Sequence, residues 1–294
     1  MNGGIEIIRI IAVILITFTH TRNNLSEGWG YFIIEKLPTY GTAILSIISG
    51  YLFFQISRKS SNLFSKKLRS LAIPYLIANG LVLLFVLGSY YIFNYNFLNR
   101  LDYDYKIITE GLLGFNEPPI NPPTYFIKDI FVLFCFITLI KNGEKKTLFF
   151  LIPLAVFGHL FHRIDIILLF GLGVFFAYFK DKIRWKYWMI LSFLAIFINS
   201  FVFTSVDLKY SVAFSVFLFF INLKLPSVNL GSFSYLLHLY HSPIMVVSYP
   251  IYSKFITSES VLIILQILTA LLGAFVLYII TRKFSFFKIV AGGR

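Results

Sequence analysis

The chain has 294 residues, of which 58% are hydrophobic, 19% aromatic and only 13% charged. Soluble domains carry about twice this share of charged residues, so the composition excludes a soluble enzyme and indicates a membrane protein. The net charge of +13 would suggest a nucleic-acid partner in a soluble protein. In a membrane protein it is explained by basic residues on the cytoplasmic side, so we expect no nucleic-acid binding.

Long apolar runs separated by charged connections predict an all-α integral membrane protein with about ten transmembrane helices. The predicted helices span residues 5–21, 40–56, 71–93, 124–140, 147–160, 164–179, 187–204, 210–222, 233–252 and 260–281. Several are shorter than the ~20 residues that a transmembrane helix needs, so these boundaries are approximate. No repeat or linker divides the chain, and we expect a single transmembrane domain over residues 1–294.

The distribution of basic residues predicts how the helices are oriented. With ten spans, both termini lie on the same side, together with alternate connections that hold seventeen of the Lys and Arg residues. The connections on the other side hold eight. Because basic residues favour the cytoplasmic side, both termini are predicted to be cytoplasmic. The longest connection, residues 94–123, is then outside, where it either covers an outward-facing cavity or is a plain loop.

The first predicted helix contains three groups that are costly in hydrocarbon, Glu6, Arg9 and His20. Glu6 and Arg9 are one helical turn apart and can form an ion pair. Arg9 and His20 are eleven residues apart, which puts them on one helix face about 16 Å apart along the axis. The face is either functional, turned to the bundle interior, or it carries a structural ion pair and a histidine satisfied at the interface.

Two further segments are polar where apolar residues are expected. Ser49 and Gly50 lie within the second predicted helix, where small side chains allow a neighbouring backbone to approach closely. The second segment, Lys66, Lys67 and Arg69, comes just before the third predicted helix. Its positive charge and the free backbone amides at a helix start both favour an anion. Alternatively, Ser49 and Gly50 serve helix packing alone. The basic residues could in turn serve only to anchor the helix to lipid headgroups.

Histidines and cysteine give little sign of a metal centre. The histidines at predicted outward positions are His159, His162, His238 and His241. Although the last two have i,i+3 spacing, the chain has one cysteine and no HExxH pattern, so we expect no metal. GxSxG, GxxxxGK[ST] and GxGxxG motifs are also missing from the sequence.

Five motifs follow one another in a recognisable order. They are Arg9 and His20 separated by ten residues, SGYL at 49–52, KKLRSLAIPYL at 66–76, TYFIKDIF at 124–131 and SYLLHLYHSP at 234–243. Together they resemble membrane acyltransferase family 3, bacterial O-acyltransferases that modify polysaccharides and other envelope glycans. The resemblance covers about residues 5–250. It implies a multi-pass protein of the bacterial cytoplasmic membrane that uses cytoplasmic acyl-CoA to acylate a sugar hydroxyl at the outer face.

The resemblance also implies which residues contact the substrates. It assigns CoA phosphate binding to Lys66, Lys67 and Arg69. Residues expected to bind substrate are Ser49, Tyr51, Lys128, Asp129 and His241. The chain departs from the family pattern at several positions, which puts the identity of the acceptor in doubt. Leu45 and Ser46 replace an aromatic pair, Tyr125 a tryptophan, Lys128 an arginine and His238 a tyrosine.

The chemistry of acyl transfer suggests roles for the first helix. An attacking hydroxyl must lose its proton, and a neutral imidazole can accept it, so His20 is the candidate general base. A covalent acyl-histidine is a variant of this mechanism. Arg9, held by Glu6, would stabilise charge on the CoA arm or on an oxyanion.

The expected partners follow from this mechanism. The donor is acetyl-CoA or another acyl-CoA, with no tightly bound cofactor, and the acceptor is a glycan or a lipid-linked sugar in contact with membrane lipids. Homo-oligomerisation is left open. A different class of function also fits the same buried charges, namely a carrier or flippase in which Glu6, Arg9 and His20 line a translocation path for a lipid-linked sugar.

Overall fold

The structure is a computed structural model, and it describes residues 3–96, 100–202 and 205–293. The described residues form helices and connecting segments, and no strand occurs among them. The helices are α1 (Gly3–Phe18), α2 (Gly28–Tyr31), α3 (Tyr40–Leu52), α4 (Leu63–Lys67), α5 (Ile73–Phe93), α6 (Lys106–Thr109), α7 (Tyr125–Asn142), α8 (Leu148–Phe157), α9 (Ile164–Phe179), α10 (Trp185–Val202), α11 (Ser205–Asn222), α12 (Gly231–Tyr252) and α13 (Glu259–Lys283).

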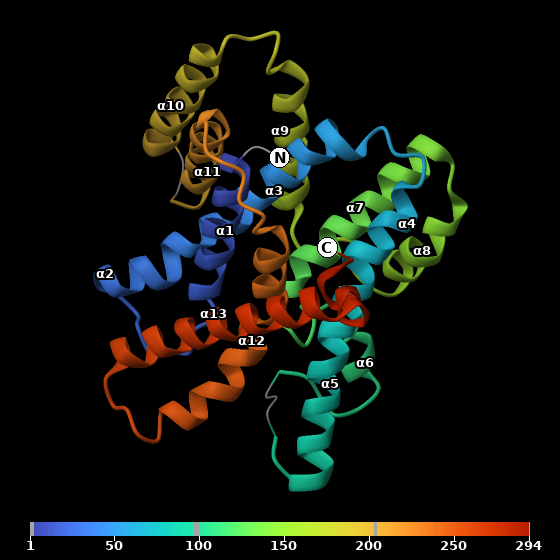
Figure 1. The fold of residues 1–294 in the computed structure, drawn as a ribbon, viewed down its shortest axis with the longest axis vertical. Helices are drawn as coiled ribbons and strands as arrows, with labels where there is room; N and C mark the ends of the chain where they lie inside the picture. The colour runs from blue at the N-terminus through green and yellow to red at the C-terminus, as the bar shows by residue number, and fades with distance from the viewer. Residues whose placement is uncertain (1–2, 97–99, 203–204, 294) are drawn as a thin grey trace.

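Helix α1 lies at the centre of the arrangement (Figure 1). It packs against α3, α11 and α12. On one side α3 continues the packing to α9, and α10 packs on α11, while on the other side α7 contacts α4 and α8. Helices α12 and α13 form a closely packed pair. The helix that carries Glu6 and Arg9 is therefore surrounded by protein along much of its length, and it ends at Phe18, two residues before His20.

Each of the ten segments predicted from the sequence is helical in the structure. The last two residues of the predicted 187–204 helix lie outside the described residues. Four helical stretches are long and apolar enough to cross a membrane, namely Gly28–Ser57, Leu63–Phe93, Pro122–Asn142 and Glu259–Lys283. These support a helical membrane protein. The number of crossings and the side of the termini stay predictions, and Arg294 of the predicted cytoplasmic tail lies outside the described residues.

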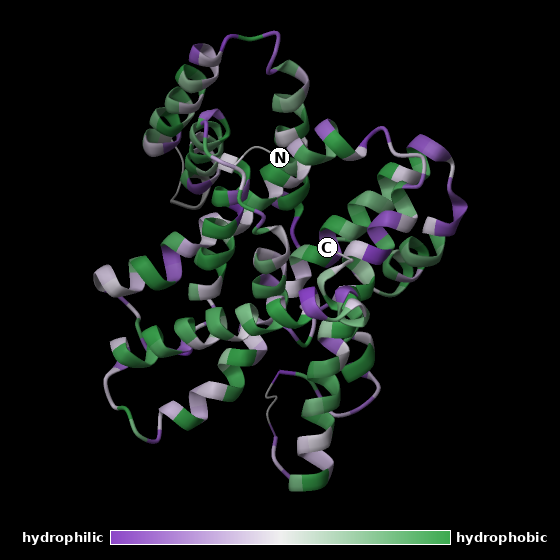
Figure 2. Ribbon diagram, in the orientation of Figure 1, coloured by the Kyte–Doolittle hydropathy of each residue, from purple (hydrophilic) through white to green (hydrophobic). Residues whose placement is uncertain are grey.

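Most of the helices are hydrophobic along much of their length (Figure 2). Many of their large apolar side chains are exposed. Phe149 on α8 is 78% exposed, and Leu84 on α5 is 69% exposed. Soluble proteins seldom leave extended apolar patches in water, because each exposed side chain forgoes the free energy of burial. A bilayer removes this penalty. The surface therefore agrees with the composition in making this a membrane protein.

The third predicted helix begins earlier than the sequence analysis expected. Residues Leu63–Phe93 form one continuous helical stretch of 31 residues. Lys66, Lys67 and Arg69 therefore lie inside it rather than before it. The helix starts at Leu63, so Lys66, Lys67 and Arg69 lie in its first two turns. Their predicted position just before a helix start is wrong, whereas the binding of an anion by these residues stays a prediction.

Two glycines allow α3 and α9 to pack with their backbones in contact. A Cβ atom on Gly50 would lie 1.9 Å from the carbonyl oxygen of Phe170. A Cβ atom on Gly173 of α9 would lie 2.1 Å from the carbonyl oxygen of Ile47. No side chain fits at such distances, so only glycine is compatible with this packing. The close backbone approach predicted for the Ser49–Gly50 pair is confirmed.

Candidate active site

Two neighbouring cavities meet in the interior of the bundle. One, of about 220 Å³, is lined by His20 together with Arg163 and is called the His20 cavity. The other, of about 140 Å³, is lined by Arg9 and is called the Arg9 cavity. Phe126 and His238 line both, so they form the partition between them. The rings of these two residues touch edge to face, with centroids 5.7 Å apart.

His20 follows the last turn of α1 and lies among other imidazoles. Its ring centroid is 5.2 Å from that of His241, which in turn is 6.3 Å from that of His238. Three residues with hydroxyl groups line the same cavity, namely Thr19, Thr39 and Thr42. No carboxylate is among the described residues that line the His20 cavity. The surroundings therefore favour a neutral imidazole, which is the form that accepts a proton.

The two histidines of α12 are deeply buried. The Nδ1 atom of His241 donates to the carbonyl oxygen of Leu237 at 2.8 Å, which leaves Nε2 without a partner. Neither ring nitrogen of His238 has a hydrogen-bond partner among the described residues. Within the same residues no group of three His, Cys, Asp or Glu side chains is arranged to hold a metal. The unpartnered nitrogens can therefore serve a polar ligand that enters the cavities.

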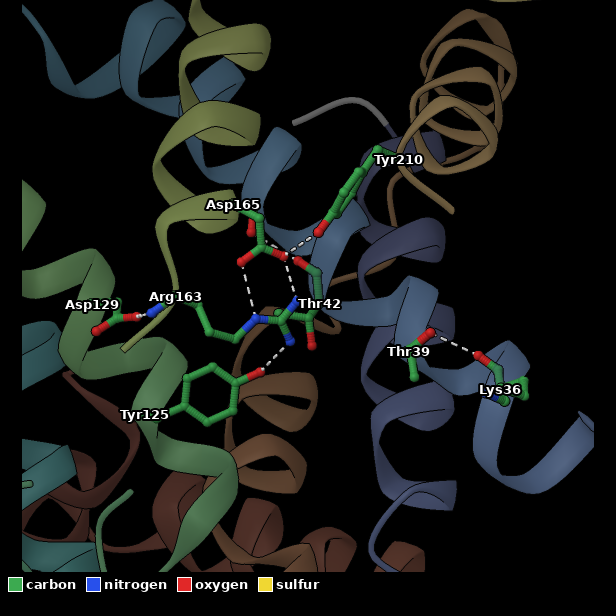
Figure 3. Close-up of polar contacts among 9 residues, drawn as sticks. Lys36, Thr39, Thr42, Tyr125, Asp129, Arg163, Asp165 and Tyr210 are labelled. Atoms are coloured by element: carbon green, nitrogen blue, oxygen red, sulfur yellow. Dashed lines mark hydrogen bonds and ion pairs between the residues drawn. The ribbon is translucent and has the colours of Figure 1, made fainter. Parts of the chain in front are cut away.

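Arg163 is fixed at the wall of the His20 cavity by a network of side chains (Figure 3). Its Nε donates to Asp165 Oδ1 at 3.0 Å, its Nη2 donates to Asp165 Oδ2, and its Nη1 donates to the Tyr125 hydroxyl at 3.1 Å. Tyr210 donates to the same carboxylate at 3.0 Å. Burial opposes the charge of Arg163, but its hydrogen bond to Asp165 and the charges around it outweigh burial and raise its pKa. The guanidinium is thus a permanent, oriented cation.

Asp129 positions the backbone that carries Arg163. This side chain on α7 is fully buried. Its Oδ1 accepts the His162 amide at 3.1 Å and its Oδ2 accepts the Arg163 amide at 3.1 Å. Both oxygens are therefore engaged with backbone, and Asp129 lines neither cavity. The substrate contact that the resemblance implies for Asp129 stays a prediction, and in the structure this carboxylate fixes the backbone that carries Arg163.

Lys128 joins two connections of the chain. Its Nζ donates to the carbonyl oxygens of Gly114 and, at 3.2 Å, of His159, and it lies 3.0 Å from His162 Nε2. Burial and the Lys128 cation lower the pKa of His162 to about 4. His162 is therefore neutral at physiological pH, and its Nε2 can accept from the ammonium. Lys128 holds the 94–123 connection in place rather than facing either cavity.

The predicted ion pair between Glu6 and Arg9 is wrong. No ion pair joins these two side chains in the described part of the chain, and Glu6 Oε2 is buried without a hydrogen-bond partner. The guanidinium of Arg9 instead turns toward α12, where its Nη1 would lie 3.4 Å from a Cβ atom on Gly231. Helical i,i+3 spacing brings two Cβ atoms close, but packing against α12 decides where the longer side chain points.

The remaining predicted residues are distributed over different environments. Ser49 lines the Arg9 cavity, and its hydroxyl donates to the Leu45 carbonyl at 2.8 Å. Tyr51 packs in an aromatic cluster, 6.0 Å from the Phe176 ring. Lys66 and Arg69 are exposed, whereas Lys67 is half-buried and lies over the Phe134 ring. Arg9, Ser49 and His20 therefore line the two cavities, and the His241 ring contacts the His20 ring. Tyr51 and the three basic residues of the 66–69 segment line neither cavity.

The Arg163 network was not predicted from the sequence. Arg163 is one of the eight basic residues in the connections predicted to lie outside. One local signal was available, since Arg163 and Asp165 are two residues apart at the start of a predicted helix. The contribution of Tyr210 could not be found in this way, because this residue lies forty-five positions further along the chain.

Comparison with known protein families identifies the family of the chain. A family model described as an acyltransferase domain matches residues 2–282, which contain both cavities and every predicted site residue. No curated protein and no solved structure matches the chain. The family match extends over nearly the whole chain. This chain therefore belongs to acyltransferase family 3 and is a membrane acyltransferase.

Proposed function

We propose that this protein transfers a short acyl group, such as acetyl, from cytoplasmic acyl-CoA to a hydroxyl of an envelope or exopolysaccharide sugar. The observation that carries the proposal is the His20 cavity, where a neutral imidazole and a fixed guanidinium line one chamber. An imidazole can take the proton of an attacking alcohol, and a cation can stabilise the charge that then develops. Location in the bacterial cytoplasmic membrane, with both termini inside, is part of this proposal.

The reaction uses these groups in a simple order. The acceptor hydroxyl attacks the thioester carbon while His20 takes its proton, so that a tetrahedral oxyanion forms. Arg163 lies at the cavity wall, where its positive charge stabilises this oxyanion. When the intermediate collapses, the carbon–sulfur bond breaks and the thiolate of CoA receives the proton from the His20 imidazolium. The products are the ester and free CoA, and no metal or redox group takes part.

The second cavity offers a route for the donor. Arg9 supplies a cation, and Ser49, Ser234 and Tyr235 supply polar groups. We place the pantetheine arm of acyl-CoA in this Arg9 cavity, from which the thioester reaches the His20 cavity past the partition of Phe126 and His238. Lys66, Lys67 and Arg69, in the first turns of the helix that begins at Leu63, keep their proposed role in attracting CoA phosphates.

The decisive experiment measures acyl transfer by a His20→Ala variant. Membranes containing the protein are incubated with radiolabelled acetyl-CoA, and label in glycan is counted per correctly folded molecule. Loss of a general base costs about 100- to 10,000-fold in rate, while donor binding persists because the imidazole acts mainly in the transition state. His159→Ala is the matched control, since His159 has an exposed side chain outside both cavities.

Two outcomes would overturn the proposal. A His20→Ala turnover within about threefold of wild type would remove His20 from the chemistry. Wild-type membranes that incorporate no label, yet move a lipid-linked sugar across the bilayer, would favour the carrier or flippase instead. The assay therefore separates the two classes of function.

A further inference from the structure

The proposed general base has no carboxylate beside it to orient its ring. His20 lies in the turn beyond α1, which ends at Phe18. None of the described residues that line its cavity is an aspartate or a glutamate. An imidazole that takes a proton through one nitrogen works best when another group fixes its tautomer and orientation through the second nitrogen. In this site a group other than a carboxylate has to do so.

His241 on α12 is the buried polar residue whose ring contacts His20. The two ring centroids are 5.2 Å apart, and the ring planes are inclined by 50°. His241 is 0% exposed, and it lines neither the His20 cavity nor the Arg9 cavity. A ligand in these cavities therefore meets His20 first, and His241 lies behind a ring that it touches.

A hydrogen bond to the backbone fixes the tautomer of His241. Its Nδ1 lies 2.8 Å from the carbonyl oxygen of Leu237, one turn earlier on the same helix. A carbonyl oxygen can only accept, so Nδ1 carries the proton. Complete burial disfavours the charged ring, and in the neutral ring Nε2 keeps its lone pair. The helix thus holds His241 as a hydrogen-bond acceptor of fixed orientation.

This acceptor has no partner in the described part of the chain, where His241 Nε2 is buried without a hydrogen bond. An unpartnered buried polar atom costs free energy, so a donor at this position stabilises the protein. The ring N–H of His20 belongs to a side chain that is only partly buried and can rotate. Catalytic hydrogen bonds are often long or poorly aligned before substrate binds, and they tighten in the complex.

The third histidine of this region has a different position. His238 lines both cavities, and its ring centroid is 6.3 Å from that of His241. Neither of its ring nitrogens has a hydrogen-bond partner among the described residues, so no backbone contact fixes its tautomer. The other charged or titratable side chains that line the His20 cavity are Tyr125 and Arg163, which bond to each other. His241 is therefore the candidate that is both fixed and in ring contact with His20.

We propose that His241 is a positioning residue whose Nε2 accepts a hydrogen bond from one ring nitrogen of His20, so that the other nitrogen of His20 keeps its lone pair toward the cavity. This inference rests on the proposed function, because it gives the general base its orienting partner. After His20 has taken the hydroxyl proton, both of its nitrogens carry hydrogen, and His241 still accepts from the same one. His241 takes no proton and does not touch the substrate. It does what a carboxylate does for the histidine of other acid–base sites.

The test compares variants that remove or keep the acceptor. His241→Phe retains a flat ring of similar size without Nε2. We expect its kcat for acetyl transfer to fall about 100-fold, because a misplaced base loses the geometry of attack. The KM for acetyl-CoA should stay at the wild-type value, since His241 takes no part in donor binding. His241→Gln can place a carbonyl oxygen near the position of Nε2, so it should turn over at least about tenfold faster than His241→Phe.

The matched control is Tyr240→Phe. Tyr240 is the preceding residue of α12, it is 8% exposed, and its hydroxyl also has no partner. The change removes a buried polar atom at the neighbouring position, and turnover per folded molecule should stay within about threefold of wild type. A purely structural role for His241 predicts that His241→Phe and His241→Gln lower the folded yield alike and keep wild-type turnover per folded molecule. That result would overturn the proposal.

A double variant tests whether His241 acts through His20. Residues that act as a unit are not additive, so adding His241→Phe to His20→Ala should lower the residual transfer by less than about threefold. A further loss of about 100-fold would mean that His241 acts independently of His20, and it would overturn the positioning role.

Failure of this inference can be told apart from failure of the proposed function. A protein that loses turnover in His20→Ala but keeps it in His241→Phe retains the proposed function and loses the orienting role of His241. Wild-type turnover in His20→Ala, or no acyl transfer by the wild-type protein, overturns the proposed function and the role of His241 with it.

Discussion

Replacing Asp129 with asparagine should release the connection that carries Arg163. The carboxylate accepts two backbone amides, those of His162 and Arg163, each at 3.1 Å. Asparagine is nearly the same size but has a single acceptor oxygen, so one amide would face an NH₂ group instead. A hydrogen bond to a charged acceptor contributes about 1.5–3 kcal/mol, so we expect Asp129→Asn to lower the free energy of unfolding by about 2–3 kcal/mol.

This loss should be visible in both stability and turnover. For a protein of this size the loss corresponds to a fall in Tm of roughly 3–5 °C, measured by thermal unfolding of the purified protein in detergent. Turnover with acetyl-CoA should fall about tenfold or more, because the Arg163 guanidinium loses its fixed position at the wall of the His20 cavity. Donor affinity should change little, since Asp129 lines neither cavity.

The control for this experiment is Asp181→Asn, which makes the same change at an exposed position. It should leave both Tm and turnover at wild-type values. An Asp129→Asn protein with a Tm within about 1 °C of wild type would refute the reasoning, because 1 kcal/mol alone moves Tm by more than this. Normal stability with reduced turnover and reduced donor affinity would point instead to direct substrate contact by Asp129.

Further predictions address the same network and its packing. The pKa of His162 is lowered to about 4 from its usual 6.5, so between these pH values the folded state binds fewer protons than the unfolded state. The free energy of unfolding should therefore fall as the pH drops from 6.5 to 4. His162→Gln should flatten this pH dependence in denaturant titrations. Tyr210→Phe removes one hydrogen bond to Asp165 and should cost about 1 kcal/mol in thermal unfolding, with Tyr187→Phe, at an exposed position, as control. Gly50→Ala should severely reduce the folded yield in detergent, whereas Gly171→Ala, in open space on α9, should be tolerated; similar yields would show that α3 and α9 separate easily.

The helices could be predicted from the sequence because their apolar runs are long and uninterrupted. The 164–179 helix has the same bounds in the structure as in the prediction. The start of α4 could not be predicted, because its basic residues interrupt the apolar run without interrupting the helix. Hydropathy shows which segments of a chain are apolar, but the ends of a helix are set by its backbone hydrogen bonds. Charged side chains lower the hydropathy without breaking those hydrogen bonds.

The site was only partly predictable, for a related reason. Arg9 lies on α1, whereas the helix ends at Phe18 and His20 lies in the turn beyond it, so the prediction that one helix carries both residues is wrong. Both residues nevertheless line cavities that meet at His238. The partner of Arg9 was predicted wrongly, because i,i+3 spacing takes no account of the neighbouring α12. The partners of Arg163 come from α7 and α9, and Tyr210 of α11 is hydrogen-bonded to Asp165 in the same network. Contacts between distant segments depend on tertiary packing, which local spacing does not specify.

Two of the departures from the family pattern, Tyr125 and His238, lie at the walls of the His20 cavity. Tyr125, which takes the place of a tryptophan, accepts a hydrogen bond from Arg163 through its hydroxyl. An indole has a donor N–H and no acceptor, so a tryptophan at this position would leave Arg163 Nη1 to another partner. His238 likewise replaces a tyrosine at the partition between the two cavities. Both changes alter the walls of the His20 cavity while His20 itself is kept. Under the proposed function they would therefore affect which acceptor fits rather than the proton transfer.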